Sequence, residues 1–210
     1  LINYNVLNLK NFRTIFILIL FFVFLKPLIN SIEHWSFENF FNLGQVLTGF
    51  FSLFIKKAFY DKKDVSLIKC YNYEDHLEKL QDCDWIIEVI AERLDWKQDL
   101  YTKIQPYVKE TAIITSNTSG ISAAELIAEM DSHMASRFFI THFFNPPRYM
   151  KLVEIIPSTK TDVSLIKPIA DFMEDTLGKG VVYAKDTPNF IANRIGVYGM
   201  MATLEAARKM

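Results

Sequence analysis

A histidine and a glutamate in two neighbouring apolar segments are the residues of this chain best suited to chemistry. His142 lies within residues 138–144, Glu154 lies within residues 152–156, and both segments are dominated by Phe, Ile, Leu and Val. Polar groups buried among such residues cost free energy unless they are partnered, so we expect the two side chains to satisfy each other. Histidine exchanges protons near neutral pH, and a carboxylate that orients its ring would make the pair a general base.

Further polar residues follow the predicted strands at their carboxyl ends. The run Ser116-Asn117-Thr118-Ser119-Gly120 follows one strand, and Asn145 follows another. In an open parallel sheet, ligands bind beyond the carboxyl ends of the strands, so these residues are candidates for a binding site. The alternative is that they make only local hydrogen bonds in turns, as Ser, Asn and Gly often do.

The pattern from residue 58 onward predicts an α/β fold. Short apolar runs alternate with segments of helical periodicity, which is typical of βα units on a parallel sheet. Residues 85–90 form a near-continuous apolar run, as expected for a strand that is covered on both faces. We expect strands at residues 85–90, 112–115, 138–144, 152–156 and 181–184, and helices at residues 73–81, 95–108, 122–130, 163–177 and from 187 to the end.

Capping residues indicate where several helices begin or end. Asp95 is an expected N-cap, and Ser122-Ala123-Ala124-Glu125 matches the capping box, in which two side chains satisfy free backbone N–H groups. Gly178 is expected to close the helix before it. Thr187-Pro188 has the order favoured at a helix start, a capping hydroxyl followed by proline. No strand follows this last helix, so we expect it to be the first element of a helical domain.

The composition changes abruptly near residue 57. Residues 1–57 contain no Ala, Asp, Met or Cys, whereas the later residues have the usage of a globular protein. We therefore divide the chain into an unassigned apolar segment (1–57), an α/β domain (58–184) and the start of a helical domain (185–210). Both ends resemble cuts in a longer sequence, because the chain begins without Met and stops within a helical pattern.

The uninterrupted apolar run at residues 15–25 allows three interpretations. It could be a signal peptide or membrane anchor, although a spanning helix needs about 20 apolar residues and no small-x-small cleavage site follows. It could be a buried or interfacial helix. It could also come from AT-rich DNA read out of frame, which encodes mostly Phe, Leu, Ile, Asn and Lys. We favour the third interpretation, and a better coding frame in the upstream nucleotide sequence would support it.

Charge and cysteine content exclude several classes of function. The formal net charge is -1 and the pI is about 6.5, so the chain lacks the basic surface that nucleic-acid binding requires. Cys70 and Cys83 fit neither a metal-ligand spacing nor a disulfide framework. We therefore expect reduced thiols, a cytoplasmic location, and no metal, nucleic-acid or membrane partner.

Residues from about 60 to 210 resemble the 3-hydroxyacyl-CoA dehydrogenases of bacterial fatty-acid β-oxidation. Several ordered motifs over some two-thirds of the chain carry the resemblance, which makes it specific. These motifs are Ile86-Ile87-Glu88-Val89-Ile90-Ala91-Glu92, Ser116-Asn117-Thr118-Ser119, His142-Phe143-Phe144-Asn145-Pro146, Lys151-Leu152-Val153-Glu154 and Lys185-Asp186-Thr187-Pro188-Asn189-Phe190-Ile191-Ala192-Asn193-Arg194.

The resemblance implies NAD-dependent oxidation of a 3-hydroxyacyl-CoA to a 3-oxoacyl-CoA. Residues 58–184 would then be a partial NAD-binding domain with a Rossmann-like doubly wound parallel sheet, and a complete helical domain would support a homodimer. The resemblance makes His142 the general base and Glu154 the residue that holds its imidazole. Ser119 and Asn193 match residues that hydrogen-bond the reacting oxygen. The positions that match the nicotinamide side of the cofactor are Glu92, Lys97, Ser119 and Asn145.

Two features of the sequence leave alternatives open. Glu92 and Lys97 flank a strand-to-helix junction, so a solvated surface pair is the alternative to a cofactor site. The family opens with a Gly-x-Gly-x-x-Gly turn that holds the cofactor pyrophosphate, but Gly44 and Gly49 are the only glycines before residue 100. We therefore expect impaired turnover. The alternative functions are a non-catalytic fragment that binds acyl-CoA or a partner subunit, and a membrane-tethered form.

Overall fold

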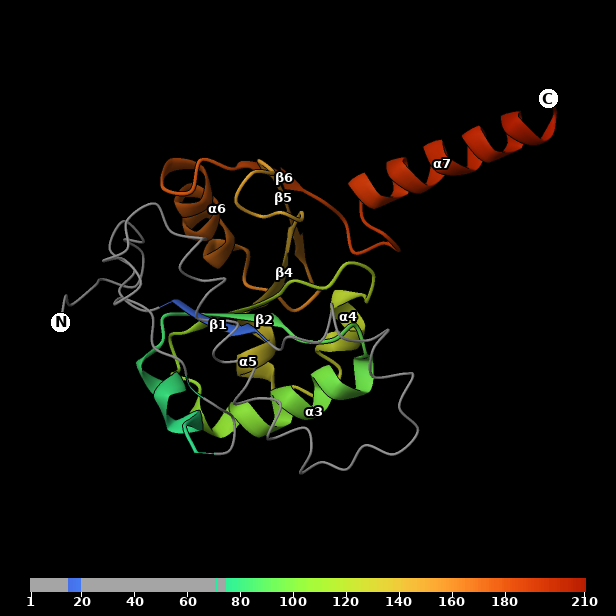
Figure 1. The fold of residues 1–210 in the computed structure, drawn as a ribbon. Coiled ribbons are helices and arrows are strands. Elements are labelled where there is room, and N and C mark those ends of the chain that lie inside the picture. The colour runs from blue at the N-terminus through green and yellow to red at the C-terminus, as the bar shows by residue number, and fades with distance from the viewer. Residues whose placement is uncertain (1–14, 20–70, 72–74) are drawn as a thin grey trace. The chain divides into compact units, whose positions relative to one another are not determined.

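The computed structural model of this chain describes residues 15–19, 71 and 75–210. Its largest element is a six-stranded sheet in which the strands lie in the order of the chain (Figure 1). The strands are β1 (Ile15–Ile19), β2 (Trp85–Val89), β3 (Ile113–Ser116), β4 (Phe138–Phe143), β5 (Leu152–Pro157) and β6 (Gly180–Tyr183). The α-helices are α3 (Leu94–Ile104), α4 (Ala123–Leu126), α5 (Ser132–Ser136), α6 (Ile166–Asp175) and α7 (Ala192–Arg208), and the 3-10 helices are η3 (Leu77–Asp82), η4 (Gln105–Tyr107) and η5 (Val163–Leu165).

The sheet confirms the Rossmann-like α/β fold class, but it is mixed rather than wholly parallel. Strands β1 to β4 pair in parallel, β5 pairs with β4 in the antiparallel sense, and β6 is parallel to β5. A parallel pair needs a crossover connection of about a dozen or more residues, and residues 144–151 are too few for one. The antiparallel pairing places Glu154 directly opposite His142.

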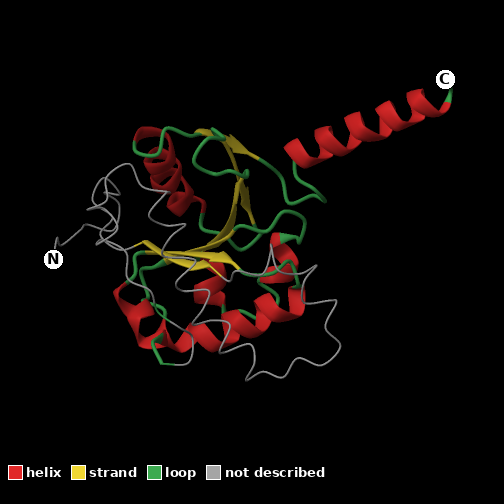
Figure 2. Ribbon diagram, viewed as in Figure 1, coloured by secondary structure: helices red, strands yellow, loops and turns green. Residues whose placement is uncertain are grey.

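Helices cover both faces of the sheet (Figure 2). Helix α6 packs on the face to which Trp85, Ile87 and Phe139 belong. Side chains at the intervening strand positions point to the opposite face. There Tyr101 of α3 makes an edge contact with Phe138, with ring centroids 5.6 Å apart. His142 and Glu154 belong to this second face.

The apolar run at residues 15–25 contributes a strand to this sheet. Residues Ile15–Ile19 form β1, which pairs in parallel with β2. The interpretation of these residues as a buried or interfacial helix is therefore wrong, because they take part in strand hydrogen bonding. Residues 20–25 and most of the segment 1–57 lie outside the described residues, and the out-of-frame hypothesis stays a prediction. No helix in the described part of the chain is long and apolar enough to cross a membrane.

The start of α3 differs from the prediction because the expected cap has another partner. Helix α3 begins at Leu94 and Arg93 is its N-cap residue, without a capping hydrogen bond from the side chain. The carboxylate of Asp95 instead accepts hydrogen bonds from the Arg93 guanidinium, which lowers the pKa of Asp95. The helix predicted at residues 73–81 is a 3-10 helix from residue 77 onward, and residues 72–74 are not described.

The capping box before α4 is confirmed. The hydroxyl of Ser122 accepts from the backbone N–H of Glu125 at 3.1 Å, and the Glu125 carboxylate accepts from the backbone N–H of Ser122 at 3.3 Å. The helix ends at Leu126 rather than near Met130. Asp131 then caps the separate helix α5, which the sequence pattern did not predict.

Residues with positive φ follow α6 and precede α7. Gly178 has a φ of 65°, which glycine adopts without strain, so the predicted closure of this helix by glycine is confirmed. Asn189 and Phe190 have φ values of 62° and 49°. These values interrupt helical geometry, so α7 begins at Ala192 and the predicted start at Thr187-Pro188 is wrong.

A buried carboxylate from the sheet caps α7 in place of the predicted threonine. One oxygen of Glu154, Oε1, accepts from the backbone N–H groups of Ile191 at 3.0 Å and Ala192 at 2.8 Å. Its other oxygen lies 2.8 Å from Nδ1 of His142, and the residue is 1% exposed. Because a helix N-terminus favours a negative charge, the start of α7 depends on this side chain.

Glu154 should therefore contribute strongly to stability. The substitution Glu154→Ala removes the acceptor for the histidine and for two backbone N–H groups, so we expect a loss of about 3–5 kcal/mol in the free energy of unfolding. Glu154→Gln keeps one acceptor oxygen and should cost about 1–3 kcal/mol. Urea unfolding followed by circular dichroism measures both. Glu129→Ala, at an exposed position, is the control, and a Glu154→Ala variant as stable as this control would contradict the capping role.

Cys83 should not react with thiol reagents while the chain is folded. It is fully buried, its Sγ lies 3.3 Å from the Lys79 carbonyl, and burial raises the pKa of the thiol from 9.0 to about 12. In a Cys70→Ser background, mass spectrometry should show no labelling by a thiol reagent at neutral pH until urea unfolds the chain. Because folding raises this pKa, the buried thiol stabilises the folded chain fully below pH 9. Between pH 9 and about 12 the thiol ionises more readily in the unfolded chain, so its contribution to the free energy of unfolding declines. Rapid labelling without urea would contradict the burial.

Candidate active site

A buried histidine and a buried glutamate face each other across β4 and β5. Nδ1 of His142 lies 2.8 Å from Oε2 of Glu154, and the two residues are 3% and 1% exposed. The predicted contact between the two side chains is therefore present. An ionised carboxylate can only accept a hydrogen bond, so in the neutral imidazole Nδ1 carries the proton and Nε2 presents its lone pair.

Two aromatic rings fix the plane of the imidazole. The ring of His142 lies 4.5 Å from that of Phe144 and 5.5 Å from that of Phe190, measured between centroids. Phe190 is one of the two residues with positive φ before α7, and it is 2% exposed. The unusual backbone of this turn thus brings an apolar side chain against the histidine.

Ser119 lies at the free nitrogen of the histidine. Its hydroxyl oxygen is 3.2 Å from Nε2 of His142. The backbone carbonyl of Ser119 accepts a hydrogen bond from Nδ2 of Asn193, at 3.2 Å. The two residues predicted to bind substrate are therefore brought together from the turn after β3 and from the start of α7.

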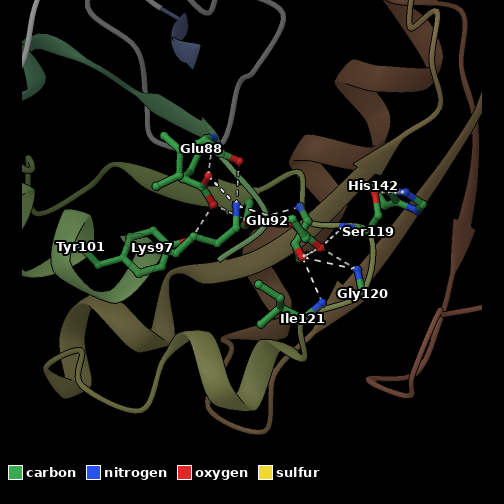
Figure 3. Close-up of polar contacts among 11 residues, drawn as sticks. Glu88, Glu92, Lys97, Tyr101, Ser119, Gly120, Ile121 and His142 are labelled. Atoms are coloured by element: carbon green, nitrogen blue, oxygen red, sulfur yellow. Dashed lines mark hydrogen bonds and ion pairs between the residues drawn. The ribbon is translucent and has the colours of Figure 1, made fainter. Parts of the chain in front are cut away.

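Glu92 holds the turn that carries Ser119. Its Oε1 accepts from the hydroxyl of Thr118 at 2.6 Å and from the backbone N–H groups of Ser119 and Gly120, each at 2.9 Å (Figure 3). These hydrogen bonds explain why a carboxylate follows β2 at this point. They also show that the run after β3 makes long-range contacts, so the interpretation of these residues as purely local turn formers is incomplete.

Lys97 is buried, which contradicts its interpretation as part of a solvated surface pair. The residue is 1% exposed, and its Nζ lies 2.7 Å from Oε1 of Glu88 and 3.8 Å from Oε2 of Glu92. The Glu92 side chain is 45% exposed, so only this member of the expected pair reaches solvent. Glu88 was not predicted as a site residue. The available signal was a charged residue in the middle of an apolar strand.

Asn145 is the one predicted site residue for which the described part of the chain shows no hydrogen bond or ion pair with another member of this group. It is exposed, it follows β4, and its peptide bond to Pro146 is cis. Within the described part of the chain, no hydrogen bond joins it to the other predicted site residues. Its assignment to the nicotinamide side of the cofactor stays a prediction.

Two further contacts that hold the site were not predicted. The carboxylate of Asp186 accepts from the backbone N–H groups of Ala123 at 2.9 Å and Ala124 at 3.0 Å. The side-chain oxygen of Asn117 accepts from the backbone N–H of Phe143 at 2.8 Å. Both contacts join segments that are distant in the sequence, so no local pattern could have found them.

The comparisons with known proteins agree with this geometry. Residues 45–187 match the family model described as 3-hydroxyacyl-CoA dehydrogenase, NAD binding domain. A relative from Deinococcus radiodurans, "Probable 3-hydroxyacyl-CoA dehydrogenase", is 49% identical over 152 residues, which cover 72% of this chain and 44% of the relative. A Bacillus subtilis relative with the same name is 48% identical over 147 residues, which cover 70% of this chain and 19% of the relative. The chain thus spans less than half of either relative.

Solved structures show the same fold. The structure of (S)-3-hydroxybutyryl-CoA dehydrogenase PaaH1 from Ralstonia eutropha has a TM-score of 0.58 and 30% identity, over 76% of this chain and 56% of that one. The M. tuberculosis protein FadB2 has a TM-score of 0.65 over 82% of this chain and 57% of that one, but at 23% identity it bears on the fold alone. Because the family model covers more than half of its length, this chain belongs to the 3-hydroxyacyl-CoA dehydrogenase family, and its matched part is the NAD-binding domain.

Proposed function

We propose that this chain carries the hydride-transfer site for NAD-dependent oxidation of a 3-hydroxyacyl-CoA to a 3-oxoacyl-CoA in fatty-acid β-oxidation. The observation that supports this most directly is the buried pair of His142 and Glu154, whose free imidazole nitrogen lies 3.2 Å from Ser119 Oγ. Such a pair is a general base in a fixed orientation. It lies near the carboxyl ends of β3 and β4, where ligands bind in open α/β sheets.

The residues present fit the nicotinamide side of NAD. Glu92, Lys97 and Ser119 are linked by short contacts beyond the carboxyl ends of β2 and β3, and Ser119 reaches His142. When bound there, NAD would accept the hydride from C3 of the substrate. The sequence holds no Gly-x-Gly-x-x-Gly turn for the pyrophosphate, so the residues of this chain would hold only the nicotinamide side in the manner of the family.

His142 would take the hydroxyl proton of the substrate. As the C3–H bond breaks and its electron pair leaves as hydride, the O–H proton passes to Nε2 and the C–O bond becomes a carbonyl. Glu154 accepts from Nδ1 and stabilises the imidazolium that forms. A positioned base of this kind contributes about 10²–10⁴-fold to the rate.

Ser119 and Asn193 would fix the reacting oxygen of the substrate. The hydroxyl of Ser119 already lies next to Nε2 of His142, and the amide of Asn193 is held at the backbone carbonyl of Ser119. Glu92 keeps the Ser119 backbone in place. Holding the reacting groups in one geometry removes an entropic part of the barrier before the reaction begins.

The expected partners and location belong to the same proposal. None of the α7 residues is buried, which supports a helical domain that would cover this helix and allow a homodimer when complete. Cys83 is a free thiol, which supports a reducing, cytoplasmic location. We also propose that the boundaries between the apolar segment, the α/β domain and the start of the helical domain lie near residues 57 and 184.

We expect this chain as written to show no detectable turnover with acetoacetyl-CoA and NADH. The physical reason is that the sequence lacks the glycine-rich turn whose free N–H groups hold the cofactor pyrophosphate in the family. A steady-state assay of NADH absorbance measures this. Ordinary turnover would show that the pyrophosphate is held by other residues.

A chimera separates the chemistry of the site from the missing turn. Residues 75–210 of this chain would replace the matching segment of the Deinococcus radiodurans relative, which supplies the remaining length. We expect the chimera to oxidise 3-hydroxybutyryl-CoA with NAD. The substitution His142→Gln should lower kcat by about 10²–10⁴-fold, because the proton acceptor is lost.

The matched control for this substitution is His133→Gln in the same chimera. His133 is exposed in α5, so its loss should leave kcat unchanged. A folded chimera without activity, or one whose kcat does not depend on His142, would contradict the proposed function.

A further inference from the structure

We propose that Glu88 is a positioning residue of this site, which holds the turn carrying Ser119 through two separate links. One link runs directly through Ser116, and the other runs through Lys97 and Glu92 (Figure 3). The catalytic meaning of these links rests on the proposed function. The links themselves consist of hydrogen bonds and ion pairs between residues of the chain.

Glu88 is fully buried in β2, and four donors surround its carboxylate. Its Oε1 accepts from the backbone N–H of Ile90 at 2.6 Å and from Nζ of Lys97 at 2.7 Å. Its Oε2 accepts from the hydroxyls of Tyr101 at 2.9 Å and Ser116 at 2.6 Å. Burying a carboxylate is costly unless its oxygens are satisfied, and a carboxylate with four donors is held in one orientation.

The first link fixes the beginning of the turn after β3. The hydroxyl of Ser116 donates to Glu88 and accepts from the backbone N–H of Thr118, at 3.2 Å. The backbone N–H of Asn117 donates to the backbone carbonyl of Glu88, at 2.8 Å. The residues that immediately precede Ser119 are therefore tied to Glu88 by both its side chain and its backbone.

The second link fixes the end of the same turn. Lys97 lies between two carboxylates, at 2.7 Å from Glu88 and 3.8 Å from Glu92. A buried ammonium group requires a negative partner. Because Glu88 supplies that partner, Oε1 of Glu92 stays with the backbone N–H groups of Ser119 and Gly120. Loss of Glu88 frees Nζ of Lys97 from its position, and loss of Lys97 removes the cation beside Oε2 of Glu92, so either change loosens the hold of Glu92 on the turn.

The same strand offers a matched control on its other face. Trp85 is 1% exposed, and its indole N–H donates to the hydroxyl of Thr115 at 2.9 Å. It packs in the cluster beneath α6 rather than in the polar network around Glu88. Trp85→Phe therefore removes a buried hydrogen bond from β2 without touching either link.

The test compares Glu88→Gln with Trp85→Phe in the full chain by NMR. Glutamine keeps the size of the side chain and removes its charge. We expect amide exchange of Ser119 and Gly120 to become about tenfold faster, which corresponds to one lost hydrogen bond. The side-chain nitrogen resonances of His142 should shift as well, because its Ser119 partner is displaced. Trp85→Phe should lower the melting temperature and leave these signals unchanged.

Two further variants keep the test decisive when Glu88→Gln does not fold. Ser116→Ala breaks the first link alone, and Lys97→Met breaks the second link alone. Each should accelerate exchange at Ser119 and Gly120. The proposal is overturned when Glu88→Gln folds with a lower melting temperature but unchanged exchange and histidine signals, or when both single-link variants leave these signals unchanged.

Kinetics in the chimera then connect positioning to the reaction. Glu88→Gln should lower kcat by about 10–100-fold, as expected for a misplaced hydrogen-bonding group, with little change in KM for the acyl-CoA. Trp85→Phe should keep the kcat of the parent chimera. An equal loss of kcat in both variants would show that Glu88 contributes to stability only and does not position the site. The NMR comparison needs neither NAD nor substrate. An inactive parent chimera would therefore count against the proposed function, while the positioning role would still be decided by NMR.

Discussion

The candidate site depends on the requirement that buried carboxylates find hydrogen-bond donors. Glu88 and Glu154 are each at most 1% exposed, and both lie on the same face of the sheet. The donors that satisfy them come from α3, from the end of β3, from β4 and from the start of α7. Leaving such oxygens unpaired would cost several kcal/mol, so each carboxylate fixes the segments that supply its donors.

This requirement also explains how the base is prepared for chemistry. Glu154 divides its two oxygens between the imidazole of His142 and the first N–H groups of α7. The orientation of the imidazole is therefore tied to the start of the helix that carries Asn193. On the opposite side of the imidazole, Glu92 holds the backbone of Ser119. The histidine thus lies between two segments that are each positioned by a carboxylate.

Local patterns in the sequence predicted the parts of the fold that depend on neighbouring residues. The apolar runs at β2 and β4, the capping box at Ser122 and the closure after α6 at Gly178 are of this kind. The predictions of helix starts failed for two different reasons. Asp95 pairs with Arg93, two residues away, instead of capping α3. The start of α7 moves from Thr187 to Ala192, because the distant Glu154 of the sheet caps this helix.

The sequence by itself determined the family and the positions of strands β2 to β6, because short apolar runs stand out from the helical pattern. It also determined the contact between His142 and Glu154, because two polar residues in apolar strands must satisfy each other. Tertiary structure alone decided that Lys97 is buried and that Glu88 is the centre of its network. It also decided that β5 runs antiparallel to β4. These features depend on which segments meet in the folded chain. The sequence offered only a charged residue in an apolar strand and a short connection before β5 as signals, and neither identifies the partner.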